Sequence, residues 1–263
     1  MKRNLIMIPA LLLTLAAITP PARAQATLFA DNFESGNLNQ WSGKLDGEQH
    51  GQIVADPFNP SNHVVNFFAT DFSGDMFTVS PVSVDSTRQR ITLSFDFLAL
   101  PIAGVPPQEY GGFAALAADN SGYTSYFVAG TVPSELNVPA SVATVLTTNG
   151  QWHHYEIDVT DAVAAYGLTN FLITLEDWES HGRSVPGDVY FDNVKLTAKL
   201  DPEVIAQLVP CSGPISGGKW KNHGQYVSTM SNVTAALVTQ GLITPQEQDA
   251  YVSAAARSGC GKK

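Results

Sequence analysis

Apolar and polar residues alternate along most of the chain between residues 27 and 198. Residues 91–97 place Ile, Leu, Phe and Phe at every second position, and residues 153–159 repeat the pattern with Tyr, Ile and Val. Such a period of two predicts strands with one face in a core and the other in water. Similar runs occupy residues 64–69, 76–84, 113–118, 123–129, 142–148, 171–176 and 189–197. About ten short strands separated by turns predict a mainly β domain, a sandwich, jelly roll or barrel.

Helical patterns are confined to one short segment and to the C-terminal part of the chain. Residues 161–166 predict a single helix between two strands, capped by Thr160 or Asp161. After a linker that starts at residue 199, a short helix is expected at 203–209. From Trp220 onward apolar residues recur at steps of three and four, which predicts a longer helix. Its apolar stripe consists of Tyr226, Val227, Met230, Val233, Leu237 and Val238.

Local signals then mark a second helix of this C-terminal pair. Gly241 fits the end of the first helix. The tetrad Thr244-Pro245-Gln246-Glu247 predicts a capping box with proline at the first helical position, opening a helix that reaches about Ser258. Residues 199–263 are therefore expected to form a linker and a small α-helical hairpin.

The N-terminal segment has the pattern of a secretory signal peptide. Two basic residues precede the apolar run Leu5–Ile18, and two Ala-x-Ala sites follow it, at 22–24 and 24–26. A run of about 14 apolar residues is shorter than the roughly 20 that cross a bilayer. We therefore expect residues 1–24 to be removed and the protein to be secreted, extracellular or periplasmic.

Charge narrows the possible partners. Removing residues 1–24, which hold three basic and no acidic side chains, changes the net charge from −10 to −13. Such a surface disfavours nucleic acids and anionic membranes, which bind proteins through Lys and Arg. Neutral polysaccharides, cations and other exported proteins remain as candidate partners.

The chain has two cysteines, Cys211 and Cys260, which flank the predicted helical hairpin. In an exported protein they are expected to form a disulfide. Two short helices cannot build a stable core alone. A bridge closing a loop of about 50 residues would add roughly 4 kcal/mol by the chain-entropy estimate.

Three motifs of the β region carry a resemblance to a known group of domains. They are Leu28-Phe29-Ala30-Asp31-Asn32-Phe33-Glu34-Ser35-Gly36 followed by Trp41, Gln151-Trp152-His153-His154-Tyr155-Glu156-Ile157-Asp158-Val159, and Tyr190-Phe191-Asp192-Asn193-Val194-Lys195-Leu196. In this order they resemble exported bacterial jelly-roll domains of the carbohydrate-binding-module-like, galactose-binding-like type. The resemblance implies a jelly-roll β-sandwich and glycan binding. It also implies structural roles for Trp41 and Trp152, which lie within the motifs.

The C-terminal segment carries a second resemblance. The strings Trp220-Lys221-Asn222-His223-Gly224-Gln225-Tyr226-Val227-Ser228 and Ser253-Ala254-Ala255-Ala256-Arg257-Ser258-Gly259-Cys260-Gly261 look like a tail module on varied bacterial secreted proteins. The resemblance implies a portable module rather than an activity, and another exported protein is a possible partner of these helices. His223 is expected to act as a cap or a core contact.

A structural calcium ion is the first candidate site. The resemblance implies one between the first and last strands, and the residues give a separate reason. If Val194 and Leu196 face the core, strict alternation turns Asp192 inward as well, where a carboxylate needs a cation, hydrogen-bond donors, or a bulge that turns it outward. The expected ligands are Glu34, Asp192, Asp31 and Asn62, completed by carbonyls of residues 56–62. The alternative is that Asp192 bonds backbone amides and Glu34 is solvated.

A sugar site is the second candidate. Aromatic rings stack on pyranose faces and polar groups fix their orientation, so a tryptophan among polar loop residues is suggestive. The candidate residues are Trp178, His181 and Arg183, with Tyr110, Tyr123 and Tyr126 from other strands and loops. The alternative is that Trp178 packs against the rim of the sandwich.

The same cluster also holds carboxylates of the kind that a glycosidase site needs. Asp177 and Glu179 are two apart and could share one face of a strand, but the order Glu176-Asp177-Trp178-Glu179 breaks the Glu-x-Asp-x-Glu spacing of sandwich-fold glucanases that this architecture resembles. The sequence therefore favours a secreted, non-catalytic binding module, with a structural or adhesive surface protein as the alternative, and a glycan hydrolase or lyase after both.

Overall fold

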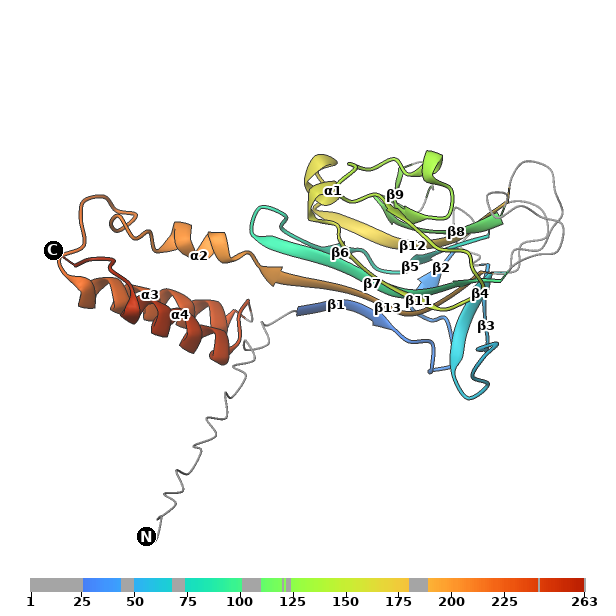
Figure 1. Cartoon of the computed structure of the whole chain (residues 1–263), viewed down its shortest axis with the longest axis horizontal. Helices are drawn as coiled ribbons and strands as arrows, with labels where there is room; N and C mark the ends of the chain where they lie inside the picture. The colour runs from blue at the N-terminus through green and yellow to red at the C-terminus, as the bar shows by residue number, and fades with distance from the viewer. Residues whose placement is uncertain are drawn as a thin grey trace, which may run out of the picture.

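The computed structural model describes most of the chain beyond the N-terminal segment. The described residues are 26–43, 50–67, 74–100, 110–119, 121, 124–179, 189–240 and 242–262, without the side chains of Tyr110, Trp178 and Glu179. The predicted signal peptide, residues 1–24, lies outside these ranges. Figure 1 shows two layers of strands with a group of helices beyond one end of them.

The first sheet, called sheet A, contains the chain's first and last described strands. Its order is β11-β7-β13-β4-β3, and β1 also pairs with β13. All of its pairs are antiparallel. The strands are β1 (Ala26–Asp31), β3 (Gly51–Ala55), β4 (His63–Phe67), β7 (Gln89–Ala99), β11 (His153–Asp158) and β13 (Val189–Leu200).

The second sheet, called sheet B, faces sheet A across the core. Its order is β10-β9-β8-β12-β5-β2, and β6 also pairs with β12. The strands are β2 (Trp41–Ser42), β5 (Asp75–Thr78), β6 (Val82–Ser83), β8 (Tyr110–Ala117), β9 (Ser125–Gly130), β10 (Thr144–Val145) and β12 (Asn170–Glu179). A 3-10 turn, η2 (Pro133–Glu135), lies between β9 and β10.

The core between the sheets is built from the apolar positions of the alternating runs. Side chains that are fully buried there include Phe33, Phe67, Phe95, Phe97, Phe171, Phe191, Ile91 and Leu93. The ring of Phe191 lies 5.1 Å from that of Phe97 and 5.7 Å from that of Phe95, measured between centroids. The predicted mainly β sandwich is confirmed.

Several predicted element boundaries need correction. The run 76–84 divides into β5 and β6, and the run 142–148 forms only the two-residue strand β10. The predicted helix forms as α1 (Thr160–Ala165), but neither expected residue caps it, because Val159 stands at the cap position without a side-chain bond. Instead, the side chain of Asp158 accepts from the backbone N–H of Thr160 at 3.0 Å.

Three helices follow the sandwich: α2 (Pro202–Leu208), α3 (His223–Thr239) and α4 (Pro245–Arg257). α3 begins three residues after the predicted start at Trp220, because Asn222 caps it by accepting from the N–H of Gln225. The predicted capping box of α4 is confirmed, with Thr244 and Glu247 bonded to each other's backbone N–H. These helices share a separate apolar cluster that runs from Leu200 to Cys260. We call residues 201–262 the helical module.

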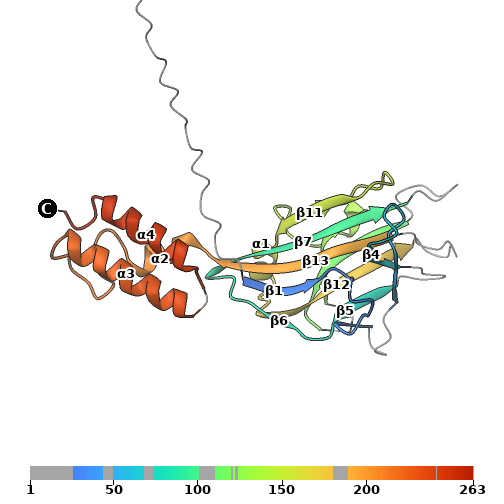
Figure 2. The same ribbon diagram turned by 90° about the horizontal axis from the view of Figure 1, so that it is seen from below.

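The module is closed by the predicted disulfide between Cys211 and Cys260. Figures 1 and 2 show α3 and α4 beside each other, beyond the end of β13 and away from both faces of the sandwich. No helix in the described ranges combines the length and the apolar character that a membrane span requires.

Candidate ligand-binding site

Sheet A has a break in its pairing where two short strands meet end to end. β4 pairs with residues 189–191 of β13, and β1 pairs with residues 194–198 on the same side. Between them the register of β13 against β7 shifts, and Asn193 adopts a positive φ of 51°. A bulge of this kind lets Phe191 and Val194 both face the core, so it breaks the strict alternation.

The bulge places Asp192 on the outer side of sheet A, and hydrogen-bond donors reach its carboxylate there, so two of the predicted outcomes occur together. Asp192 is nonetheless only 5% exposed. Its carboxylate accepts from the backbone N–H of Asn193 at 2.6 Å and from the side-chain amide of Asn62 at 3.0 Å. Burial raises the pKa of Asp192, and the nearby carboxylates of Asp96 and Glu34 act in the same direction.

The turn between β3 and β4 covers this carboxylate with a second buried acid. Asp56 is 7% exposed, and its Oδ2 lies 3.4 Å from the amide nitrogen of Asn62. Its Oδ1 accepts from the backbone N–H of Phe58 at 2.8 Å and from the indole N–H of Trp152 at 3.1 Å. Asp56 therefore connects the turn to the start of β11.

The two other predicted calcium ligands already have local partners. Glu34 accepts from the backbone N–H of His63 at 2.9 Å and lies 3.3 Å from its ring, and the backbone bond is the main reason that the pKa of Glu34 is lowered. Asp31 accepts from the N–H of Phe33 at 2.9 Å and from the indole of Trp41 at 2.8 Å. Asp31 thus fixes the turn after β1.

The residues around the bulge suit a hard cation by their chemistry. Asp192, Asp56 and Asn62 offer oxygen atoms, which calcium prefers, and Glu34 is close enough to affect the charge of Asp192. The two buried carboxylates share one neutral amide, that of Asn62. Among the described residues, no three acidic, histidine or cysteine side chains are already grouped as a metal centre.

An aromatic side chain lies across the outer face of sheet A beside this cluster. Trp152 precedes His154, which pairs with Asp96 of β7, whereas Asp56 belongs to the turn on the far side of β13. Because these two strands, each about 4.8 Å from its neighbour, lie between the two residues, the bond between Trp152 and Asp56 brings the indole and the β3–β4 turn together over the sheet. Trp152 is partly exposed, and Phe58 on the same turn is 61% exposed.

Exposed polar groups border these two rings. His154 Nδ1 lies 2.6 Å from Asp96 Oδ1, and the side-chain amide of Asn193 donates to Asp96 Oδ2 at 2.7 Å. The three side chains therefore form one hydrogen-bonded row across β11, β7 and β13. We call Trp152 and Phe58 together with this row the outer platform. The sequence motif predicts a structural role for Trp152. It does not predict that part of the ring is exposed.

The predicted sugar-binding residues do not all come together. In the backbone register, Trp178 pairs with Gly111 and Glu179 with Tyr110, so Trp178 and Tyr110 lie at the same end of sheet B. Tyr126 pairs with Leu116, some 20 Å along β8 by strand geometry. Its ring stacks on that of Tyr166 at a centroid distance of 3.9 Å. The other predicted ligand residues, Tyr123, His181 and Arg183, lie outside the described residues.

The predicted catalytic alternative meets an obstacle at Asp177. This side chain is fully buried, and its Oδ1 accepts from the backbone N–H of Gly74. Glu176 is also buried, at 7% exposure. A carboxylate that must reach a glycosidic bond needs access to substrate, so Asp177 does not suit that role.

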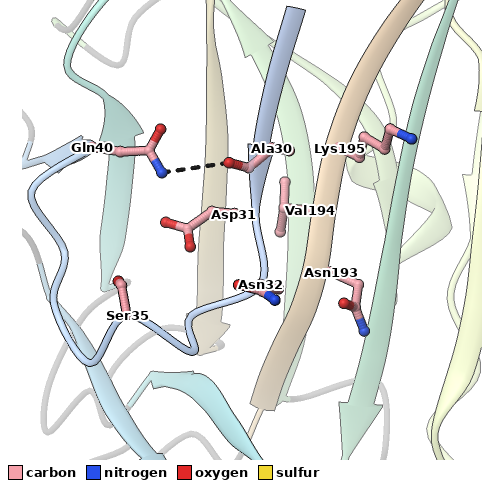
Figure 3. Close-up of a pocket in the computed structure, with 8 residues that line it drawn as sticks. All are labelled: Ala30, Asp31, Asn32, Ser35, Gln40, Asn193, Val194 and Lys195. Carbon is pink, nitrogen blue, oxygen red and sulfur yellow. Dashed lines mark hydrogen bonds between the residues drawn. The ribbon is translucent and has the colours of Figure 1, made fainter. Parts of the chain in front are cut away.

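Two of the cavities that described residues line open on the surface of the sandwich. The larger, about 470 Å³, lies beside β1 and β13 and is shown in Figure 3. Ala30, Asp31, Gln40, Asn193 and Lys195 are among its lining residues, and the Gln40 amide donates to the carbonyl of Ala30 at 3.4 Å. The smaller, about 310 Å³, lies on the sheet B side, next to the buried Phe77 and Leu172. None of the described residues that line the larger cavity is aromatic, so they offer no stacking surface for a pyranose.

Similar folds exist among known structures, although the sequence itself has no match. No family model matches the chain, and no curated protein is similar to it in sequence. The CBM22-2 xylan-binding domain of Xyn10C from Paenibacillus barcinonensis is 18% identical, with a TM-score of 0.39 over 65% of this chain and 99% of that domain. The mannan-recognising carbohydrate-binding module TmCBM27 is 14% identical, with a TM-score of 0.38 over 66% and 98%.

A third similar structure is an adhesin domain rather than a carbohydrate-binding module. The K3 cleaved adhesin domain of Lys-gingipain from Porphyromonas gingivalis is 14% identical, with a TM-score of 0.41 over 65% of this chain and 99% of that domain. Likeness at this level concerns the arrangement of strands, and it says nothing about the ligand of this chain.

Proposed function

We propose that the protein is an exported, non-catalytic glycan-binding protein and that its sugar lies on the outer platform. The observation that carries the proposal is the anchored indole of Trp152, whose N–H is bonded to the buried Asp56 while its ring stays partly exposed. A ring held in this way loses little freedom on binding, which favours stacking on a pyranose face. Phe58, 61% exposed on the same turn, supplies a second apolar surface.

The polar row gives the platform a means to orient a sugar. His154 and Asn193 are both exposed, and each is held by Asp96 through one side-chain atom. The remaining ring nitrogen of His154 and the amide oxygen of Asn193 can therefore bond to hydroxyl groups without first being ordered. Sites for small ligands commonly combine an apolar surface with a few placed polar groups.

The experiment is a binding screen on neutral polysaccharides with single-ring variants. Phe58→Ala is the cleanest variant, because the side chain is exposed and only its backbone N–H is bonded. We expect Phe58→Ala to weaken retention several-fold and Trp152→Ala to weaken it at least about tenfold, which corresponds to about 1.4 kcal/mol. Ile215→Ala, which shortens an exposed apolar residue of the helical module, is the matched control and should bind as wild type.

A parallel variant tests the location predicted from sequence. If Trp178→Ala abolishes retention while Phe58→Ala and Trp152→Ala do not, the sugar site lies at the end of β12 and the platform is wrong. If no neutral glycan is retained but the protein binds cells or matrix, the structural or adhesive alternative is favoured. Release of reducing ends would contradict a non-catalytic role.

A structural calcium ion at the bulge of β13 is the second part of the proposal. Asp192 and Asp56 are both buried and share the side-chain amide of Asn62, and a raised pKa for Asp192 means that its negative charge is poorly compensated. Asp192, Asn62, Asp56 and Glu34 would hold the ion. Calcium would neutralise the cluster and tie the β3–β4 turn to the last strand, which keeps Asp56 in place for Trp152.

Thermal unfolding with and without calcium tests this part. Calcium at about 100 times its Kd would add about 2.7 kcal/mol to the stability of the fold that binds it. We expect the melting temperature of the chelated protein to rise when calcium is added, and Asp192→Asn to reduce that rise. Glu135→Gln, an exposed acid elsewhere on the sandwich, is the control. An identical melt in chelator and in calcium would contradict the site.

A further inference from the structure

The two parts of the chain differ strongly in charge. Residues 27–200 contain 20 acidic and 6 basic side chains, whereas residues 211–263 contain 2 acidic and 5 basic ones. Between residues 204 and 246, and again from 250 to the end, there is no Asp or Glu. A chain with an acidic surface overall therefore carries a segment whose charge has the opposite sign.

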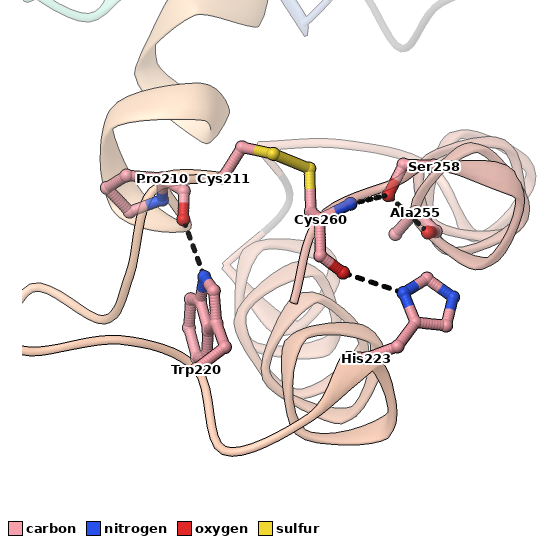
Figure 4. Close-up of a disulfide and its surroundings, with 7 residues drawn as sticks. All are labelled: Pro210, Cys211, Trp220, His223, Ala255, Ser258 and Cys260. Atoms are coloured by element: carbon pink, nitrogen blue, oxygen red, sulfur yellow. Dashed lines mark hydrogen bonds between the residues drawn. A yellow bond between two sulfur atoms is a disulfide. The ribbon is translucent and has the colours of Figure 1, made fainter. Parts of the chain in front are cut away.

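The fold gathers the basic side chains of this segment at one end of the helical module. The disulfide joins the loop before α3 to the residues after α4. His223 reinforces the junction, because its two ring nitrogens lie 2.7 Å from the carbonyl oxygen of Cys260 and 3.0 Å from that of Ala256. Figure 4 shows the imidazole of His223 pointing toward the backbone carbonyl oxygen of Cys260.

This end of the module faces away from the sandwich. Figure 1 places the C-terminus at the extreme end of the molecule, while α2 connects to β13 at the other end of the module. The cationic residues here are Lys219, Lys221, Arg257 and Lys262, which we call the basic tip. All four side chains are exposed, and in the described part of the chain none of them forms an ion pair.

The loop that carries two of these lysines is fixed in several places. The indole of Trp220 donates to the carbonyl of Pro210 at 2.9 Å, and Trp220 itself is 7% exposed. Gly217 and Gly218 adopt φ values of 94° and 87°, which other residues rarely take. Lys219 and Lys221 are thus displayed on an ordered loop, which lowers the entropic cost of using them.

We propose that the basic tip binds an anionic polysaccharide and thereby anchors the sandwich to it. All four cations are exposed, which fits an extended polymer with repeated carboxylates or sulfates better than a small anion that needs an enclosed site. A membrane is a less suitable ligand for the basic tip, because a membrane-binding surface needs exposed apolar side chains. The apolar residues of the module form its own core, and Ile215, 69% exposed, is the large apolar residue at this end that lies outside it.

The acidic charge of the sandwich is expected to orient the molecule as the basic tip binds the polymer. A molecule with charges of opposite sign at its two ends is turned by an anionic surface, so that the basic end approaches first. The sandwich would then point away from the polymer, leaving its outer face free. This inference does not depend on the proposed sugar platform, since it concerns different residues and a ligand of different charge.

The test measures retention of the full, disulfide-bonded chain on immobilised polygalacturonate, with neutral dextran as the reference. We expect retention on polygalacturonate at about 20 mM sodium chloride and its loss by about 300 mM, as screening shortens the reach of exposed charges. The double variant Lys219→Glu with Lys221→Glu should weaken binding at least about tenfold at low salt. Both side chains are exposed, so the melting temperature should be unchanged.

A matched double variant separates the tip from overall charge. Lys195→Glu with Lys199→Glu makes the same change of net charge on β13 of the sandwich, and it should leave retention nearly unchanged. Equal losses in the two double variants would overturn the proposal, because net charge alone would then explain binding. Retention on vesicles with phosphatidylglycerol but not on polygalacturonate would overturn it in favour of a lipid surface.

Discussion

The sandwich and the helical module are held together by different kinds of interaction. The sandwich buries many large side chains between two sheets, among them six fully buried phenylalanines in the described part of the chain. The module has a smaller apolar cluster, and short helices of this kind rarely persist without further support. Its disulfide, its two capped longer helices and the clamp made by His223 supply that support.

The junction between the two regions combines the apolar Leu200, which belongs to the cluster of the module, with polar bonds of Asp201. β13 continues directly into α2, and Asp201 at this point bonds to the backbone carbonyl of Arg88 at 2.8 Å and to the side chain of Arg90 at 3.1 Å. The nearby charge of Asp201 is the main reason that the pKa of Arg90 is raised. A junction of this kind transmits little packing energy, so each region should unfold without the other.

The largest expected effect comes from breaking the covalent closure of the module. Cys211→Ser with Cys260→Ser opens a loop with a sequence separation of 49 residues. The chain-entropy estimate gives a loss of about 4 kcal/mol. Because so small a core cannot offset that loss, we expect α3 and α4 to lose protection in hydrogen exchange while the strands of both sheets keep theirs.

The matching control is reduction of the wild-type disulfide under the same conditions, which should have the same effect. Loss of protection throughout β7 and β13 would show that the module supports the sandwich. Unchanged protection in α3 and α4 would show that the helices are stable without their bridge. Either outcome would break the comparison between the two regions.

A second substitution attacks the sandwich alone, at the turn after β1. Asp31→Ala removes the acceptor of the buried indole of Trp41 and of the amide of Phe33, whose φ of 55° is unusual for a bulky residue. Leaving buried donors without a partner costs about 2 to 3 kcal/mol. Denaturant unfolding followed by Trp fluorescence should show one destabilised transition.

The conservative variant sharpens this result. Asp31→Asn keeps an oxygen for one of the two donors and should recover part of the lost stability. If Asp31→Asn and Asp31→Ala behave alike, the charge rather than the geometry of Asp31 matters. A shift in the unfolding of the helical module by either variant would contradict independence of the two regions.

The two regions also differ in how well a sequence predicts them. In the helical module the signals are local: a capping box needs four residues, and the bond between Thr244 and Glu247 formed as predicted. In the sandwich, the alternating runs predicted most strands, but β2 and β3 were missed. Both are short, and β3 is paired with β4 through the turn between them.

The site was harder to predict because it depends on long-range register. The turn containing Asp56 and the start of β11 are far apart in sequence, and their meeting follows from the order of the strands in sheet A. The bulge at Asn193 was one of three outcomes for Asp192, and only the pairing of β13 with β1 and β4 selects it. Exposure of Phe58 has no sequence signal, since an apolar residue in a turn is as often buried.

A third prediction returns to the helical module with a smaller change. Thr244→Ala removes the side-chain half of the capping box and should cost about 1 kcal/mol. The loss should shift the unfolding of α3 and α4 and leave the sandwich transition in place. Thr239→Ala is the control, because this exposed threonine bonds only to the carbonyl of Ala235 within its own helix. Equal effects of the two variants would mean that the cap contributes nothing specific.

The smallest expected effect concerns the dependence of sandwich stability on pH. Burial raises the pKa of Asp192 in the folded chain above the ordinary value of 3.8. At a pH between 3.8 and this raised pKa, the folded chain binds more protons than the unfolded one. The contribution of Asp192 to stability therefore falls as pH rises through that window, and it stays reduced above it. In chelator, Asp192→Asn should remove this slope and raise the stability at neutral pH.

Glu34, in the same cluster, is expected to change the stability with pH in the opposite direction to Asp192. The backbone bond from His63 lowers its pKa below 4.5, so its contribution is present above that value and is lost as pH falls through the lowered pKa. Glu34→Gln should therefore weaken the sandwich at neutral pH, where Asp192→Asn strengthens it. Bound calcium favours the ionised form of Asp192, so adding it should turn the gain in Asp192→Asn into a loss. Melting temperatures across pH, in chelator and in calcium, separate the cases: a gain that persists in calcium would exclude the ion from this cluster.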